Sequence, residues 1–329
     1  MDNNEVVDEF GNELGGDEER YYELGDQDTP SLMTGKKILS RCGLYLSLMT
    51  FAIFAVQILI TIIVAIISDD AAGENWFNIL ITAVGVGGVG LPVFYKLMKR
   101  IPDSEKREQK KLSIGKFLGF FLVCSAGQYI SNMVGLLISG MIELIKGIEV
   151  VNPVEILLDG NMVLTMIYVV ICGPILEELI FRKILLDKLR RFGDLPAMLI
   201  TGFAFGLFHF NLSQFFYATV LGILFAYITL HTNRIRYSIL LHILINLMGG
   251  GITPLIAASE SFTAMSLIAI WLLVAVTVGS VLFIVNIKKV KLYKPNVPLV
   301  RKSNYIFNPG SILFLTISLV MIILSLVGN

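Results

Sequence analysis

The sequence predicts an all-α protein, a polytopic transmembrane helical bundle of about eight to nine spans with an acidic cytoplasmic N-terminal tail. Two observations carry this prediction. Of the 329 residues, 55% are hydrophobic and only 16% are charged, whereas an average soluble domain is about a quarter charged. The mean hydropathy of +0.75 agrees. This composition excludes a soluble globular domain, a disordered chain, a collagen-like repeat and a disulfide scaffold.

The formal net charge of zero conceals two regions of opposite sign. Residues 1–30 contain eleven acidic residues and one basic residue, Arg20, so the remainder has 25 basic and 15 acidic residues and a net charge of +10. Residues 1–35 contain no apolar run and no visible cleavable signal peptide. We therefore expect a solvated, disordered tail. A docking site for a partner protein is the alternative interpretation of this tail.

Nine apolar segments are candidates for membrane-spanning helices, each of which needs about 20 apolar residues. They cover residues 43–68, 76–95, 117–142, 156–181, 195–211, 215–231, 237–253, 263–287 and 311–328. The fifth and sixth segments are short, and the polar stretch at residues 211–214 separates them. These two segments are either two tilted spans or a partly re-entrant pair.

The basic residues test this segmentation independently, because Lys and Arg concentrate in cytoplasmic loops. In a nine-span arrangement, all of them except Lys146 fall on one side. The N-terminus is then cytoplasmic and the C-terminus lies outside. We expect an integral membrane protein of a bacterial cell membrane.

An ionisable side chain inside a bilayer has a high free-energy cost, so each of them calls for an explanation. Glu177 and Glu178 lie at the end of the fourth segment, His209 lies near the end of the fifth, and His242 lies in the first turns of the seventh. Glu178 precedes Arg182 by four residues, so these two can pair along one helix face. Glu177 points about 100° away on the helix and is left free to face the bundle.

Two further helices offer polar groups at matching spacings. Phe205 and His209 share one helix face, and His242 and Asn246 share another, because each pair is four residues apart. Counted at about 1.5 Å per residue, these groups and Glu177 lie at similar depths, between the cytoplasmic surface and mid-membrane. This predicts one shared site that opens towards the cytoplasm. The alternative is that the groups only join helices through hydrogen bonds.

The patterns Glu-Glu-x-x-x-Arg, Phe-x-x-x-His and His-x-x-x-Asn on successive membrane segments resemble the signature of a known family. It is the CAAX protease and bacteriocin-processing family, which includes type II CAAX prenyl endopeptidases and bacterial immunity or processing proteins. The matching residues are Glu177, Glu178, Arg182, Phe205, His209, His242 and Asn246. The resemblance covers about residues 160–255, less than a third of the chain.

The resemblance implies a hydrolase, an endopeptidase that carries out intramembrane proteolysis on a membrane-associated protein or peptide. In this role Glu177, helped by His209, would activate a water molecule. His242 and Asn246 would hydrogen-bond the tetrahedral oxyanion. The supporting residues would be Glu178, Arg182 and Phe205.

The resemblance also leaves open a zinc mechanism. In that case Glu177, His209 and His242 would be the three protein ligands, with water in the fourth position. We favour the metal-free mechanism, with no cofactor. A metal-bound Glu177 would leave another group to act as the base, and Glu178 is expected to be occupied by Arg182.

This interpretation divides the chain into four regions. They are an acidic tail at 1–35, N-terminal transmembrane helices at 36–155, a protease-like catalytic core at 156–255 and C-terminal transmembrane helices at 256–329. The expected partners are the lipid bilayer and a membrane-associated protein or peptide substrate, and not nucleic acid. Two alternative functions are a non-catalytic membrane scaffold or immunity protein of the same family and a proton-coupled transporter.

Overall fold

A computed structural model describes most of the chain, namely residues 21–22, 33–105, 107–147, 162–259, 261–295 and 300–327. These residues are overwhelmingly helical, which confirms the all-α prediction. Their only strands are the two-residue antiparallel pair β1 (Tyr21–Tyr22) and β2 (Met33–Thr34). The rest of the tail expected to be disordered, residues 1–20 and 23–32, lies outside the described residues.

Eight helical stretches in the described residues are long and apolar enough to cross a bilayer. They are Gly35–Ile67, Asn75–Met98, Ile114–Lys146, Val163–Phe192, Leu212–Thr232, Ile235–Ala258, Phe262–Ile287 and Pro309–Leu326. The helix predicted as the fifth span, α10 (Asp194–Leu207), has only 14 residues and is about 21 Å long. The chain is an integral membrane protein whose count agrees with the predicted eight to nine spans.

Several of these stretches are built from shorter helical pieces, including π-helical runs. The first is α1 (Gly35–Ile67), the second consists of α3 (Asn75–Ala83), the π-helix η1 (Val84–Gly90) and α4 (Leu91–Met98), and the third is α5 (Ile114–Lys146). The short helix α2 (Asp69–Gly73) lies between the first and the second. The fourth consists of α7 (Met162–Met166), the π-helix η2 (Ile167–Cys172), α8 (Gly173–Glu178), the π-helix η3 (Leu179–Leu185), α9 (Leu186–Leu189) and the 3-10 turn η4 (Arg190–Phe192). After α10 come α11 (Leu212–Thr232), α12 (Ile235–Asn246), the π-helix η5 (Leu247–Ile252), α13 (Thr253–Ala258), α14 (Phe262–Ile287), the 3-10 turn η6 (Lys302–Tyr305) and α15 (Pro309–Val327).

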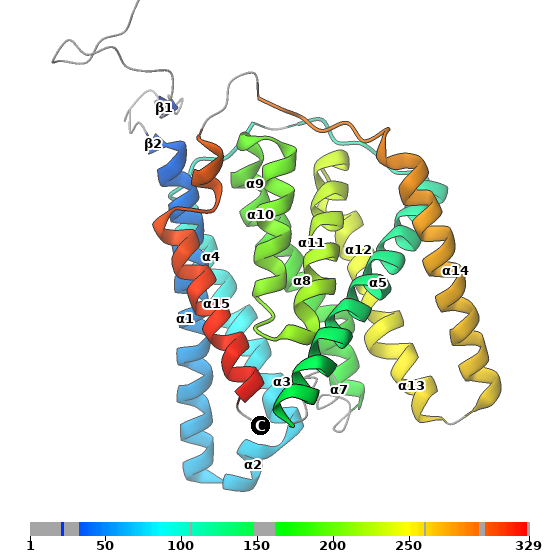
Figure 1. The fold of residues 1–329 in the computed structure, drawn as a ribbon. Coiled ribbons are helices and arrows are strands. Elements are labelled where there is room, and N and C mark those ends of the chain that lie inside the picture. The colour runs from blue at the N-terminus through cyan, green and yellow to red at the C-terminus, as the bar shows by residue number, and fades with distance from the viewer. Residues whose placement is uncertain are drawn as a thin grey trace, which may run out of the picture.

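The helices lie side by side in one bundle (Figure 1). Helices α1 and α15 pack together at one edge, α5 and α14 pack at the other, and α8 to α12 lie between them. Outward-facing side chains are apolar, as a lipid-facing surface requires, and include Leu144 at 88% and Phe262 at 86% exposure. Helix α1 begins at the end of the bundle opposite to the one where α15 ends.

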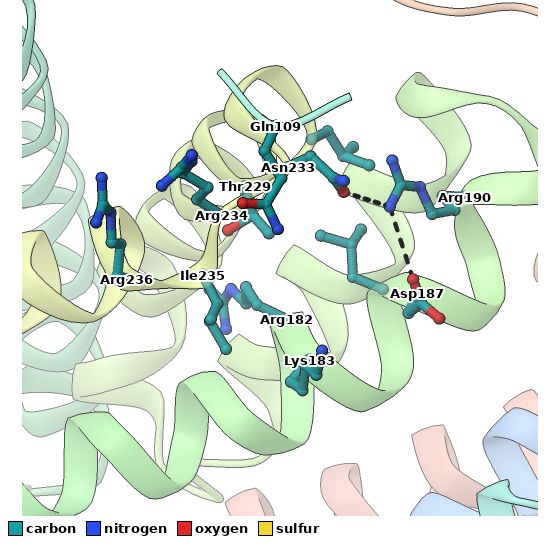
Figure 2. Close-up of a pocket in the computed structure, with 12 residues that line it drawn as sticks. Gln109, Arg182, Lys183, Asp187, Arg190, Thr229, Asn233, Arg234, Ile235 and Arg236 are labelled. Atoms are coloured by element: carbon teal, nitrogen blue, oxygen red, sulfur yellow. Dashed lines mark hydrogen bonds and ion pairs between the residues drawn. The ribbon is translucent and has the colours of Figure 1, made fainter. Parts of the chain in front are cut away.

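One end of the bundle carries the basic connections. The extended segments that follow α4 and α14 run across the same end as the start of α1 and the α11–α12 turn (Figure 1). Figure 2 shows part of this end, where Lys183, Arg190 and Arg234 gather. We refer to it as the basic end. That the basic end faces the cytoplasm stays a prediction.

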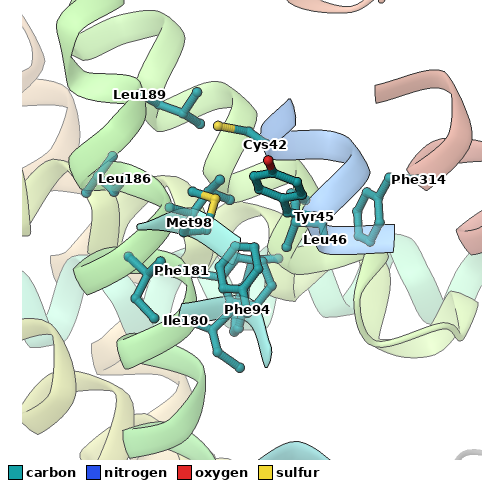
Figure 3. Close-up of a cluster of buried hydrophobic side chains, with 14 of the residues drawn as sticks. Cys42, Tyr45, Leu46, Phe94, Met98, Ile180, Phe181, Leu186, Leu189 and Phe314 are labelled. Carbon is teal, nitrogen blue, oxygen red and sulfur yellow. The ribbon is translucent and has the colours of Figure 1, made fainter. Parts of the chain in front are cut away.

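A buried apolar cluster fixes the helix that carries the two glutamates (Figure 3). Phe94 and Met98 of α4 pack against Ile180 and Phe181 of η3, and Tyr45 of α1 completes this part of the cluster. These side chains are at most 6% exposed. Close packing of this kind resists rotation of a helix about its axis. The cluster therefore determines which face of the preceding α8 turns towards the bundle interior.

Helices α10 and α11 form a close antiparallel hairpin. Gly202 and Gly222 face each other at the crossing, and a Cβ added to Gly222 would lie only 2.8 Å from the Cα of Gly202. The turn between the helices contains Phe210 at φ 54°, a left-handed conformation that is uncommon for a residue with a side chain. Asn211 then caps α11 by accepting a 2.9 Å hydrogen bond from the backbone N–H of Gln214. The cap and the close crossing hold this turn inside the bundle.

Candidate active site

A cavity of about 600 Å³ lies inside the helical bundle. Its wall contains the four residues predicted to be catalytic and one of those predicted to support them: Glu177, His209, His242, Asn246 and Phe205. They are carried by α8, by α10 and the turn that follows it, and by α12. The structure thus brings residues from three separate motifs to one cavity, which we call the central cavity.

Glu178 and Arg182 form a buried ion pair behind this wall. The Nε atom of Arg182 lies 3.4 Å from Oε2 of Glu178, and both side chains are fully buried. One terminal nitrogen of Arg182 also donates a 3.2 Å hydrogen bond to the carbonyl of Gly222 in α11. The guanidinium lies 4.5 Å from the ring centre of Phe205, a cation–π distance. The expected pairing along one helix face is present, and it ties η3 to both helices of the hairpin.

His242 lies between the two glutamates. Its Nδ1 atom is 3.1 Å from Oε1 of Glu178, and its Nε2 atom is 3.6 Å from Oε2 of Glu177. A carboxylate can only accept, so Nδ1 carries a hydrogen and Glu178 fixes the orientation of the ring. The rings of Phe205 and Phe225 pack around it at 5.7 and 5.0 Å. The separation from Glu177 is too long for a direct hydrogen bond.

Glu177 has a different environment from its neighbour in the sequence. Its side chain is 24% exposed, whereas that of Glu178 is fully buried. Among the described residues, Glu177 has no arginine or lysine ion-pair partner. The carboxylate of Glu178 is therefore held in a buried ion pair, whereas the carboxylate of Glu177 faces the central cavity.

His209 is fixed by backbone contacts at the end of α10. Its Nδ1 atom lies 2.9 Å from the carbonyl oxygen of Phe205, one turn earlier. Since a carbonyl only accepts, Nδ1 carries the hydrogen, and Nε2 is the nitrogen left for chemistry in the central cavity. Asn211 donates a 2.7 Å hydrogen bond to the His209 carbonyl. The residue that caps α11 thus also steadies His209.

Asn246 is anchored to the helix that carries the glutamates. Its side-chain amide donates a 2.9 Å hydrogen bond to the carbonyl of Val169 in η2. An amide has two hydrogens, so a second remains to be donated. The π-helices η2 and η3 lie on either side of α8, and such turns are frequent at functional sites. Pro174 is the second residue of α8, one residue after the start of the helix that carries the glutamates.

Sequence analysis missed several polar residues of the central cavity. They include Gln57 of α1, Gln128, Tyr129 and Asn132 of α5, and Gln214 and Tyr217 of α11. Gln128 and Asn132 are four residues apart in an apolar segment, the same spacing as His242 and Asn246. This spacing could have identified them. Neutral amides cost less to bury than ions, which made them less conspicuous among the apolar residues.

The zinc alternative finds limited support in the donor arrangement. Glu177, His209 and His242 line the same cavity. In the part of the chain that the structure describes, however, no group of three or more His, Cys, Asp or Glu side chains is placed to hold a metal ion. The three proposed ligands thus do not converge on one point in this arrangement.

The segment that carries the motifs is similar to a known family of membrane proteins. Residues 159–248 match the family model described as "Type II CAAX prenyl endopeptidase Rce1-like". The match contains all seven motif residues and confirms the predicted resemblance over this segment.

A related protein of Bacillus subtilis (strain 168) is named "Putative membrane peptidase YdiL" and is 30% identical over 164 residues. The aligned part is 47% of this chain and 64% of that protein, so the chain covers less than two thirds of the relative's length. No solved structure matches the chain.

Proposed function

We propose that this protein is an intramembrane endopeptidase that hydrolyses a peptide bond of a membrane-associated protein or peptide. The observation that carries the proposal is the gathering of Glu177, His209, His242 and Asn246 around one cavity inside a membrane bundle. The similarity of residues 159–248 to type II CAAX prenyl endopeptidases supports this reaction class. The name of the Bacillus subtilis relative supports it as well.

Glu177 is the proposed general base. Its carboxylate faces the central cavity and is not held by an arginine, so it is available to take a proton from a water molecule. The water oxygen then forms a bond to the carbonyl carbon of the substrate. Nε2 of His209 accepts a hydrogen bond from the same water and orients it. These two residues come from different helices, so the activated water is placed between α8 and α10.

His242 and Asn246 are the proposed donors to the oxyanion that forms on the substrate carbonyl. Asn246 has a second amide hydrogen to offer. His242 can donate from Nε2 while Nδ1 donates to Glu178 only when both ring nitrogens carry hydrogen. The carbon–nitrogen bond then breaks, and the proton taken by Glu177 passes to the leaving amine. The products are a carboxylic acid and an amine.

Glu178, Arg182 and Phe205 are positioning residues in this scheme. Glu178 orients the ring of His242, and Arg182 balances the buried charge of Glu178. Phe205 packs against the guanidinium of Arg182 and the ring of His242. A protein that acts only as a scaffold or immunity protein needs no such alignment of a free carboxylate with two histidines. This is why we favour the enzyme over the scaffold. The similarity of residues 159–248 to type II CAAX prenyl endopeptidases is why we favour it over a proton-coupled transporter.

The finer assignments are part of the same proposal. The substrate is reached from the basic end, which we place in the cytoplasm of a bacterial cell with the N-terminus on that side. Prenylated C-terminal motifs and the leader peptides of bacteriocin processing are both substrate classes of the family that the motifs resemble. The hydrolysis itself uses no metal.

The test compares membranes that contain the full chain with membranes that contain Glu177→Gln. Peptides released from membrane proteins are identified by mass spectrometry. We expect the wild-type products to be absent from Glu177→Gln membranes at equal protein level and equal thermal midpoint. Glu74→Gln is the matched control, because this exposed carboxylate lies between α2 and α3 and does not line the central cavity. Identical peptide sets from wild type and Glu177→Gln would contradict the proposal.

A further inference from the structure

A second cavity, of about 280 Å³, lies at the basic end where η3 and α9 meet the α11–α12 turn. We call it the basic cavity. Figure 2 shows that its charged side chains come from both sides of this junction. The ionisable residues in its lining are five bases and one acid: Arg182, Lys183, Arg190, Arg234, Arg236 and Asp187. An excess of positive charge around a cleft is the electrostatic setting of an anion site.

Two of these bases have counter-ions. Arg182 pairs with Glu178, and Arg190 lies 3.6 Å from Asp187. Arg236 donates a hydrogen bond to the hydroxyl of its neighbour Tyr237. In the described residues, Lys183, Arg234 and Arg236 have no acidic partner. The protein therefore does not neutralise the basic cavity by itself.

Several guanidinium nitrogens around the basic cavity are buried and lack hydrogen-bond partners. They are Nε and one terminal nitrogen of Arg190, Nε of Arg234, and one terminal nitrogen of Arg182. Arg190 is only 6% exposed and Arg182 only 2%. Native proteins rarely leave buried donors unsatisfied. A bound acceptor with several oxygens would satisfy these donors.

Hydrogen bonds hold the walls of the basic cavity in place. Asn233 ends α11 in a left-handed conformation, with φ 51°, and accepts a 2.8 Å hydrogen bond from Arg190. Its amide nitrogen donates to the carbonyl of Arg107, and the backbone N–H of Lys110 donates to the carbonyl of Thr232 at 2.8 Å. These contacts hold the extended segment across the basic end, and Gln109 of that segment completes the lining. A pre-organised site loses little entropy on binding.

The location points to the class of ligand. Three candidate spans, Val163–Phe192, Leu212–Thr232 and Ile235–Ala258, begin or end beside the basic cavity. The ends of spans lie at the level of lipid headgroups, where basic pockets between helices bind anionic lipids. The forked guanidinium group matches the geometry of a phosphate.

We propose that the basic cavity binds a phosphate group, either the headgroup of an anionic phospholipid or a free phosphate. This site is separate from the central cavity. Its binding does not depend on whether the protein is a peptidase.

The test uses the full chain purified in a neutral detergent. Native mass spectrometry measures adducts with phosphatidylglycerol and with zwitterionic phosphatidylcholine, and calorimetry measures the binding of inorganic phosphate. The variant Lys183→Gln/Arg234→Gln removes two charges from the lining. Lys288→Gln/Lys291→Gln removes two exposed charges at the same end but outside the lining and is the matched control. If the double variant does not fold, Arg234→Gln alone provides the comparison.

We expect the lining variant to weaken phosphate-type binding by about tenfold or more, because charge-assisted hydrogen bonds are lost. The control should bind as the wild type does. A preference for phosphatidylglycerol over phosphatidylcholine that is lost in the variant identifies the headgroup as the ligand. Binding of inorganic phosphate alone, lost in the variant, identifies free phosphate. If the wild type binds neither, or if the control loses as much as the lining variant, the proposal is overturned.

Discussion

Substitution by Gln should destabilise the protein much more at Glu178 than at the adjacent Glu177. Glu178→Gln removes the counter-ion from Arg182 at a site where neither side chain reaches solvent. Removing one partner of a buried ion pair costs about 3–5 kcal/mol, because the other charge is left uncompensated. Glu177 is 24% exposed and has no arginine or lysine ion-pair partner in the described residues. Its replacement by Gln should cost about 1 kcal/mol or less.

Thermal unfolding of the full chain in detergent measures this contrast. For a chain of this size, each kcal/mol moves the midpoint by about 2–4 °C. We therefore expect Glu178→Gln to unfold roughly 6–20 °C below the wild type. Glu177→Gln should unfold close to the wild type and yet lack the proposed peptidase activity.

The double variant Glu178→Gln/Arg182→Gln serves as the control. It removes both charges, so neither is left buried without its counter-ion, which is the main cost of the single substitution. Its midpoint should therefore lie above that of Glu178→Gln. The reasoning is refuted if the two single variants unfold at the same temperature, or if the double variant regains nothing.

Two further predictions concern the hairpin and the metal. Gly202→Ala should destabilise the protein by about 1–3 kcal/mol, because the new Cβ would lie 2.7 Å from the backbone nitrogen of Ile223. Gly119→Ala is the control and should not destabilise it, because a Cβ at this position would have nothing within 4 Å. Equal thermal midpoints of the two variants would contradict this account of the hairpin. Treatment with 1,10-phenanthroline should leave the proposed peptidase activity unchanged, because no metal-binding cluster is formed in the described residues. A loss of activity that added zinc restores would favour the zinc mechanism.

Much of the fold could be predicted because its signals are local. The length of each apolar run and the placement of bases between runs gave the count of eight to nine spans. The length of α10 could not be predicted in this way. The apolar run at residues 195–211 continues into the turn at Phe208 and Phe210, whose side chains are apolar although the helix has ended. Hydrophobicity alone does not distinguish a buried turn from the last turn of a helix.

In the candidate site too, some contacts have a local signal in the sequence and others do not. The Glu178–Arg182 pair lies within one helix, so spacing in the sequence was sufficient to predict it. The contact between His242 and Glu178 joins residues 64 positions apart, and it depends on how α12 packs against α8. The basic cavity depends on the extended segment near Gln109 folding across the α11–α12 turn. Neither relation has a local signal in the sequence.

The composition of the central cavity wall has a consequence for how such a protein can diversify. The proposed chemistry resides in the segment that matches the family model, residues 159–248. A large part of the wall comes from elsewhere, with Thr50 and Gln57 of α1 and Gln128 and Asn132 of α5 lying outside that segment. Mutations in α1 and α5 can therefore reshape the space offered to a substrate while the catalytic groups stay in place. Part of the surface that a substrate would meet is thus encoded outside the stretch of the gene that carries the proposed chemistry.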